Sequence, residues 1–271
     1  MVKDGVGTFI DDAVAEVVLD LPPVNAVTTG MYVELTRVFN ELSNRVDVQV
    51  ILLRSAAARG FSAGADVKEQ VAAASPAEPA DVYRQRLATT CYDAIMDCAQ
   101  PSIAVVHGFA LGAGTVIAAC CDIRYAADTA RIGLPEINVG RCGGGRHLMR
   151  LIPQGKTRLM YFTGEPIAAE EAMRLDLVQG VFPAERVLEE ARSLARTIAG
   201  KSPLGLRLAK RALNESESME VKAGYRHEQT YTLRLGRHPD AREAVRATLE
   251  RRPPVWTRAE PAKAGSAQSV S

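Results

Sequence analysis

The stretch "VVHGFALGAGTVIAACCD", from Val105 to Asp122, places three glycines after an apolar run and then resumes with small apolar residues. The apolar run predicts a buried strand, and the residues after the glycines predict a helix. The first N–H groups of such a helix lack acceptors within the helix and carry the positive end of its dipole. Small residues there let an oxygen approach the main chain closely.

A second loop, "VILLRSAAARGFSAGAD" from Val50 to Asp66, repeats this design of a buried strand, small residues and a helix start. Two such loops beside neighbouring strands would each aim one backbone N–H at a single oxygen, which describes an oxyanion hole. The alternative is that the glycines serve tight turns and close helix packing. A dinucleotide-binding loop is less favoured, because "GFALGAG" lacks the order GxGxxG.

Strand and helix patterns alternate over the first two thirds of the chain and predict an α/β fold. "AVAEVVLDLP" predicts a strand that Pro22 and Pro23 end, and "TGMYVELTRVFNELSNR" predicts an amphipathic helix with Thr29 as its N-cap. A further helix is expected over 82–98, followed by the buried strand "PSIAVVHG". From about Ile167 the pattern is helical.

We therefore expect an α/β core over residues 1–198, a helical region for oligomerisation over 199–257, and a disordered tail over 258–271, which lacks large apolar groups. The chain of 271 residues has a net charge of +1, which gives no reason to expect a nucleic-acid partner. No apolar run reaches the ~20 residues of a membrane span, and the N-terminus lacks a signal peptide's apolar stretch, so we expect a cytoplasmic protein without a membrane partner. The cysteines show no metal-ligand spacing, which predicts reduced thiols and no metal site.

The segments "GFSAGADVKE", "PSIAVVHGFALGAG", "CDIRYAAD" and "IGLPEINVG" resemble consecutive signatures of the enoyl-CoA hydratase/isomerase, or crotonase, superfamily. The resemblance extends from about Val14 to Val255. It implies a spiral of ββα units with a helical C-terminal region, assembled as a homotrimer or a dimer of trimers. It also implies an acyl-CoA substrate, of which coenzyme A is a part and not a separate cofactor, and an enolate stabilised at the thioester oxygen.

The resemblance assigns the two oxyanion N–H donors to Ala63 and Ala113, with Ala113 in place of the family's more usual glycine. The segment from Ala63 to Val67 would run beside the CoA adenine and pantetheine. The substrate-binding candidates that the resemblance adds are Asn25, Ala26, Gly64, Ala65, Asp66, Val67, Gly112 and Val116.

The acidic residues depart from the family's hydratases, which usually carry two glutamates. One is present as Glu136 in "IGLPE", whereas the other maps onto Val116, which cannot transfer a proton. A single carboxylate favours either an enoyl-CoA isomerase or hydrolytic C–C cleavage of a β-keto-acyl thioester. The loop "GRCGGGRHLMRLIPQ" is shorter than the family's usual one and resembles that of ring-opening hydrolases of cyclic keto-acyl-CoA compounds; it adds Arg141 and His147 as further candidates.

Two alternatives stay open. A hydratase (lyase) could retain activity with the oxyanion hole and one carboxylate. A non-catalytic member that binds CoA or RNA belongs to another functional class. Against RNA binding stands the absence of a basic stripe interleaved with aromatic residues, and against a loss of catalysis stands the presence of Glu136 and of both glycine loops.

Overall fold

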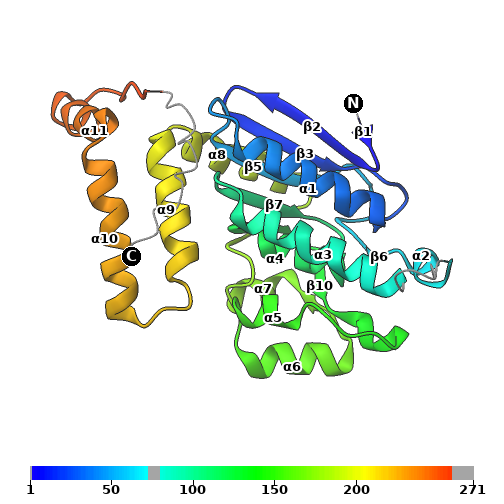
Figure 1. The fold of residues 1–271 in the computed structure, drawn as a ribbon. Coiled ribbons are helices and arrows are strands. Elements are labelled where there is room, and N and C mark those ends of the chain that lie inside the picture. Colours follow the sequence, from blue (N-terminus) through cyan, green and yellow to red (C-terminus); the bar gives the residue numbers. More distant parts are fainter. Residues whose placement is uncertain (1, 73–79, 258–271) are drawn as a thin grey trace.

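A sheet of seven strands forms the centre of the computed structural model, which describes residues 2–72 and 80–257 (Figure 1). The first three strands pair antiparallel, and β3, β5, β7, β9 and β12 are parallel. The strands, in their order across the sheet, are β1 (Val2–Lys3), β2 (Val6–Asp11), β3 (Val14–Leu19), β5 (Val50–Ser55), β7 (Ser102–Val106), β9 (Ile123–Ala127) and β12 (Gly180–Phe182). The predicted buried strands are confirmed.

Helices cover both faces of this sheet. On one face lie α1 (Thr29–Ser43) and α3 (Ala80–Asp97), which pack against each other, and on the other lies α8 (Val187–Ala199). The prediction of Thr29 as the N-cap of α1 is wrong by one residue, because the Thr28 hydroxyl accepts the capping hydrogen bond from the Met31 N–H at 3.1 Å.

Three consecutive strands of the large sheet are each followed by a short strand and then a helix, which is the predicted spiral of ββα units. β5 leads to β6 (Gly64–Ala65) and α2 (Val67–Ala72), and β7 leads to β8 (Phe109–Leu111) and α4 (Ala113–Cys120). β9 leads to β10 (Arg131–Gly133) and the 3-10 helix η1 (Pro135–Val139). The short strands pair with one another, β8 with β10 and β6 with β4 (Ala26–Val27), and so hold the loops at one side of the large sheet.

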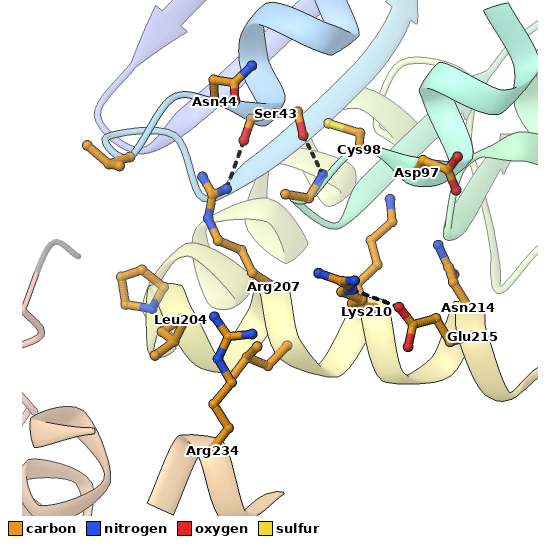
Figure 2. A pocket seen from close by; sticks show the side chains of 15 residues that line it. Ser43, Asn44, Asp97, Cys98, Leu204, Arg207, Lys210, Asn214, Glu215 and Arg234 are labelled. Carbon is orange, nitrogen blue, oxygen red and sulfur yellow. Dashed lines mark hydrogen bonds and ion pairs between the residues drawn. The ribbon is translucent and has the colours of Figure 1, made fainter. Parts of the chain in front are cut away.

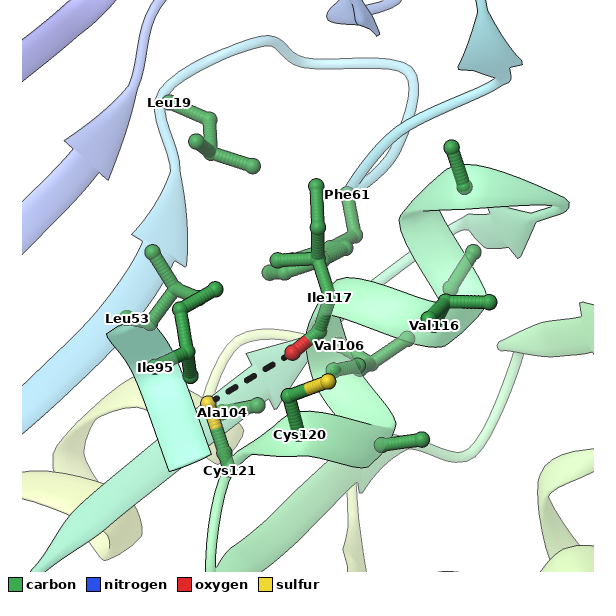
Figure 3. Packing of buried hydrophobic residues seen from close by; sticks show 14 of the residues in the cluster. Leu19, Leu53, Phe61, Ile95, Ala104, Val106, Val116, Ile117, Cys120 and Cys121 are labelled. Atoms are coloured by element: carbon green, nitrogen blue, oxygen red, sulfur yellow. Dashed lines mark hydrogen bonds between the residues drawn. The ribbon is translucent and has the colours of Figure 1, made fainter. Parts of the chain in front are cut away.

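The helix α4 is buried along its whole length (Figure 3). Ile117 and Val116, adjacent on this helix, point in different directions. Cys120 and Cys121, which end it, are free and buried, and burial raises the pKa of the Cys121 thiol to about 12. Cys91 and Cys98 are also free and buried, whereas Cys142 is exposed; that the thiols are reduced stays a prediction.

The rest of the chain is mainly helical. The helices α9, α10 and α11 stand to one side of the α/β core (Figure 1). The division of the chain near residue 198 into two domains stays a prediction, and the tail predicted over 258–271 lies outside the described residues. The remaining elements are α5 (Gly145–Met149), α6 (Gln154–Thr163), β11 (Ile167–Ala168), α7 (Ala169–Arg174), α9 (Pro203–Ser216), α10 (Val221–Gly236) and α11 (Pro239–Glu250).

Candidate active site

Both glycine loops and Glu136 meet at one cavity of about 320 Å³. Its wall includes Ala65 on β6, Ala113 at the start of α4, and Glu136 on η1. The three segments that the sequence singled out therefore converge. The other residues of the wall are Tyr32, Asp81, Arg84, Gln85, Ala88, Tyr92, Gly140, Arg141, Cys142, Gly143 and Gly144.

The two loops touch through their main chains at Gly64. A methyl group at Gly64 would lie 2.8 Å from the carbonyl oxygen of Leu111 and 3.6 Å from the amide nitrogen of Ala113. The φ of Gly64 is +94°, a conformation that side chains disfavour. Glycine is thus required here both by its conformation and by the close approach of the second loop.

The expectation that Ala63 supplies an oxyanion donor is wrong. Its N–H donates to the Val24 carbonyl at 2.9 Å, its side chain is exposed, and it is not part of the cavity wall. Ala65 takes its place in the wall. The N–H of Asp66 donates to Val27 of β4 at 3.0 Å, and neighbouring N–H groups of a strand point to opposite sides, so the Ala65 N–H points away from β4.

Ala113, the other expected donor, opens the helix α4. Its N–H is among the first of the helix, which have no acceptor within the helix, and the helix dipole adds positive charge there. Gly112 before it has a φ of +53° and is held by its own N–H, which donates to Gly133 of β10 at 2.9 Å. Gly112 itself is not in the cavity wall; it positions Ala113.

The Glu136 carboxylate lies directly against the second loop. A methyl group at Gly112 would be 2.7 Å from Glu136 Oε1. Glu136 Oε2 is buried and has no hydrogen-bond partner among the described residues. Burial raises the pKa of the Glu136 carboxyl, and a hydrogen bond from its own backbone N–H offsets part of that rise. This is a carboxylate suited to taking up and returning a proton.

Val116 does not line the cavity, contrary to expectation. It is 2% exposed, and a methyl group at Gly144 would lie 2.5 Å from Val116 Cγ2. The loop residues Gly143 and Gly144 form the cavity wall in front of it. The loop and the apolar residue at position 116 are therefore in close contact, and the loop lies between that residue and the cavity.

Asn25 is fully buried, so it cannot line a CoA channel as expected. Its side-chain amide donates to Ser55 Oγ at 2.7 Å and to the Phe61 carbonyl at 2.9 Å, which ties β4 to the first loop. Asp66 accepts from the Lys68 N–H at 2.7 Å at the start of α2. Ala26 pairs with Gly64, and Val67 is exposed. Contact of Ala26, Asp66 and Val67 with CoA stays a prediction.

The two candidates of the short loop have different positions. Arg141 is part of the cavity wall, and its Nη1 donates to Asp81 Oδ2 at 2.7 Å. His147 lies one layer behind, where its ring packs edge-on against Tyr92 at a centroid distance of 5.4 Å. Burial lowers the pKa of His147, and its Nδ1 is buried without a partner among the described residues. His147 therefore supports Tyr92 and does not itself face the cavity.

Comparison with known proteins agrees with this architecture. The family model described as "Enoyl-CoA hydratase/isomerase" matches residues 10–259. The chain belongs to this family, and it is an enzyme.

Among its relatives, a (7aS)-7a-methyl-1,5-dioxo-2,3,5,6,7,7a-hexahydro-1H-indene-carboxyl-CoA hydrolase from Rhodococcus jostii is 36% identical over 83% of this chain and 86% of its own length. A 2,3-dehydroadipyl-CoA hydratase from Escherichia coli is 34% identical over 85% of this chain and 89% of its own length. A crystal structure of a Geobacillus kaustophilus enoyl-CoA hydratase superimposes with a TM-score of 0.88 at 29% identity, over 96% of this chain and 98% of that one. The relatives thus include both enoyl-CoA hydratases and hydrolases named for an indene-carboxyl-CoA.

The sequence reasoning missed the polar side chains that α1 and α3 bring to the cavity of this enzyme. Tyr32 and Tyr92 approach each other with their hydroxyl oxygens 3.2 Å apart, and burial raises the pKa of Tyr32 to about 12. Asp81 is a second carboxylate in the cavity wall, beside Glu136. Unlike Glu136, Asp81 forms ion pairs with both Arg84 and Arg141.

A signal for these residues was present in the helical spacing of α3. Arg84 shares the buried stripe of Ala88, Cys91 and Ile95, which recur at intervals of three and four residues. A charged residue on an apolar stripe indicates a functional position more often than a surface one does.

A second cavity, of about 470 Å³, lies between α9 and the end of α1 (Figure 2). Arg207 donates across it to the Ser43 carbonyl at 2.9 Å, and Lys210 pairs with Asp122 at 2.8 Å and donates to the Gln100 carbonyl at 3.0 Å. These cations bind groups of the core, and the cavity contains none of the predicted site residues. It marks the contact between the helical region and the core.

No helix within the described residues is long and apolar enough to span a membrane. Among the same residues, no three histidine, cysteine or acidic side chains gather as metal ligands. That the reaction needs neither a metal nor a separate cofactor stays a prediction.

Proposed function

We propose that this enzyme opens the ring of a cyclic β-keto-acyl-CoA by hydrolytic C–C cleavage, with Glu136 as the catalytic carboxylate and the N–H groups of Ala65 and Ala113 as the oxyanion hole. The observation that supports this most directly is the close packing of the Gly144 backbone against Val116, the apolar residue at the position of a hydratase's second glutamate.

In the first step, Glu136 removes a proton from a water molecule, whose oxygen adds to the ring ketone carbon. The partnerless, desolvated carboxylate of Glu136 is suited to act as this base. Collapse of the adduct forms the new carboxylic acid and breaks the bond between the ketone carbon and Cα. The electron pair of that bond moves into the thioester as an enolate.

In the second step, the enolate takes the proton from Glu136 at Cα, which returns the carboxylate to its starting state. The thioester bond remains intact, and one water has been added across the broken C–C bond. Throughout, the enolate oxygen would accept from Ala65 and Ala113. Backbone donors of this kind need no reorganisation as the charge develops.

Isomerase chemistry is the second candidate, because a single carboxylate can also remove and return a proton. The cavity wall favours the hydrolase over this candidate, since Tyr32, Asp81, Arg84 and Arg141 are polar, whereas a linear enoyl chain is apolar. The relative from Rhodococcus jostii is named as a hydrolase of a dioxo-indene-carboxyl-CoA, an acyl group that carries polar ketone oxygens. A polar cavity wall suits an acyl group of this kind.

Turnover of three thioesters tests the proposal: 2-ketocyclohexanecarboxyl-CoA, 3-hexenoyl-CoA and crotonyl-CoA. The proposal predicts a higher kcat/KM for the ring compound than for either of the others, with pimelyl-CoA as its product. Preferential conversion of 3-hexenoyl-CoA would replace it with the isomerase, and preferential hydration of crotonyl-CoA would replace it with the hydratase.

We also propose that the helical region mediates assembly into a trimer or a dimer of trimers. Tyr225 and Leu233 on α10, and Leu249 on α11, are 62%, 64% and 79% exposed. Apolar side chains so exposed on one region favour contact with another subunit. Light scattering should report a trimer or hexamer, and a stable monomer would contradict this.

A further inference from the structure

Arg84 has an unsatisfied N–H donor beside the reaction cavity. The residue is 7% exposed and belongs to the cavity wall. Its Nη2 donates to Asp81 Oδ1 at 3.2 Å, but its Nη1 is buried with no hydrogen-bond partner among the described residues. A buried donor of a charged group without an acceptor is costly, so such a group indicates a ligand that completes it.

The charges around Arg84 leave an excess of positive charge at this end of the cavity. Asp81 binds both Arg84 and Arg141, so that one carboxylate faces two guanidinium groups. Within the described residues, Glu136, the other acid of the wall, makes no ion pair with either arginine, and its Oε2 is buried without a hydrogen-bond partner. The arginine end of the wall is therefore complementary to one further negative charge.

Arg84 borders the cavity together with small and aromatic side chains. Ala88, one helical turn further along α3, also belongs to the wall and has a small side chain. Tyr32 lies within the electrostatic range of both Arg84 and Glu136, since the first lowers its pKa and the second raises it. Tyr32, Arg84 and Glu136 line the same cavity, so the two charged groups are placed to contact different parts of one bound molecule.

We propose that Arg84 binds a carboxylate of the acyl group, remote from the thioester, and so selects acyl-CoA molecules that carry one. The planar guanidinium with a spare N–H matches the geometry of a carboxylate oxygen. This inference rests on the proposed acyl-CoA site but not on the ring-opening reaction. The carboxylate could belong to the substrate, or ring opening could produce it.

The test compares the binding of two thioesters that differ only in the terminal group, pimelyl-CoA and heptanoyl-CoA, by isothermal titration calorimetry. Wild-type enzyme should bind pimelyl-CoA more tightly by about tenfold to a hundredfold, the range of a hydrogen bond to a charged group. Arg84→Gln should lose that difference. Arg86→Gln, on the exposed side of the same helix, is the matched control and should keep it.

The proposal is overturned if wild type binds the two thioesters equally tightly, or if Arg84→Gln prefers pimelyl-CoA as strongly as wild type does. Either result would leave Arg84 as a partner of Asp81 alone. A folding defect is recognised by circular dichroism, and Arg84→Lys then serves as the second variant: it keeps the charge and should retain part of the preference. Because these measurements need no turnover, they stand even if ring opening is not the reaction.

A kinetic arm separates the two sources of the carboxylate. It compares 2-ketocyclohexanecarboxyl-CoA with the same ring bearing an added carboxymethyl group. A lower KM for the carboxymethyl compound in wild type, absent in Arg84→Gln, assigns the site to a carboxylate of the substrate. Equal KM values together with preferred pimelyl-CoA binding assign it to the carboxylate of the product.

Discussion

The two walls of the reaction cavity are built from different kinds of groups. On one side the groups belong to the main chain: the N–H groups of Ala65 and Ala113, fixed by strand pairing and by the start of a helix. On the other side they belong to side chains, because Glu136 and Arg84 line the cavity next to the short glycine loop. In the proposed reaction the main-chain wall would hold the enolate of any thioester, whereas the side-chain wall would determine which bond is made or broken.

The largest effect is expected on the side-chain wall. Glu136→Gln should lower kcat for ring opening by about 10²–10⁴-fold, the usual contribution of a general acid–base group. Binding of heptanoyl-CoA, measured by calorimetry, should persist because the backbone donors remain. Full activity of the variant would show that another group transfers the proton.

A methyl group on the main-chain wall should be nearly as harmful. Gly112→Ala would place a methyl 2.7 Å from Glu136 Oε1 at a φ of +53°, so Glu136 and the Ala113 N–H must both shift. We expect kcat to fall by about 10²–10³-fold, as for loss of one oxyanion donor, and the free energy of unfolding to fall by about 1–3 kcal/mol from backbone strain. Gly155→Ala, which meets no atom within 4 Å, is the control. Undiminished kcat in Gly112→Ala would separate this loop from catalysis.

Restoring the family's missing acid should fail to restore hydration. In Val116→Glu the new side chain meets the backbone of Gly144, so we expect a stability loss of about 1–3 kcal/mol from overpacking and no gain in crotonyl-CoA hydration. Val116→Gln, of similar size but without charge, separates crowding from the effect of the carboxylate. A tenfold or greater gain in hydration with Val116→Glu alone would show that the cavity has kept the shape of a hydratase.

The smallest effect concerns stability and pH. Because burial raises the Glu136 pKa above the ordinary 4.5, the folded state holds this proton more tightly than the unfolded chain, and stability is lost as the pH rises through the raised value. Glu136→Gln should therefore unfold at a higher urea concentration than wild type at pH 7. This difference in the urea midpoint should vanish when the pH is below the ordinary carboxyl pKa of 4.5. A less stable variant at pH 7 would mean that the carboxylate has a stabilising partner.

The sequence was sufficient for the parts of this site that follow from local patterns. The strand and loop before Ala113 and the position of Glu136 could be predicted, because apolar runs, glycines and the family motifs are contiguous in the chain. The choice of Ala63 over Ala65 failed because the left-handed Gly64 turns the chain between them, so that only one of the two residues reaches the cavity.

The side-chain wall was less predictable, since it depends on helix orientation and on contacts between distant segments. Arg84 and Tyr32 lie more than fifty residues from each other along the chain and still share one cavity. Asn25 was misplaced for the same reason: its amide binds groups far along the chain, at Ser55 and Phe61, which no local pattern reports.

The fate of oxygen from solvent tests the proposed reaction most directly. Wild-type enzyme is incubated with 2-ketocyclohexanecarboxyl-CoA in ¹⁸O-labelled water, and the products are analysed by mass spectrometry. Ring opening through Glu136 predicts pimelyl-CoA with a single heavy oxygen in the carboxylate remote from an intact thioester, and no such product from Glu136→Gln. Two results would contradict it. One is heavy oxygen in an acid that is released together with free CoA, and the other is failure to convert the ring compound by enzyme that hydrates crotonyl-CoA.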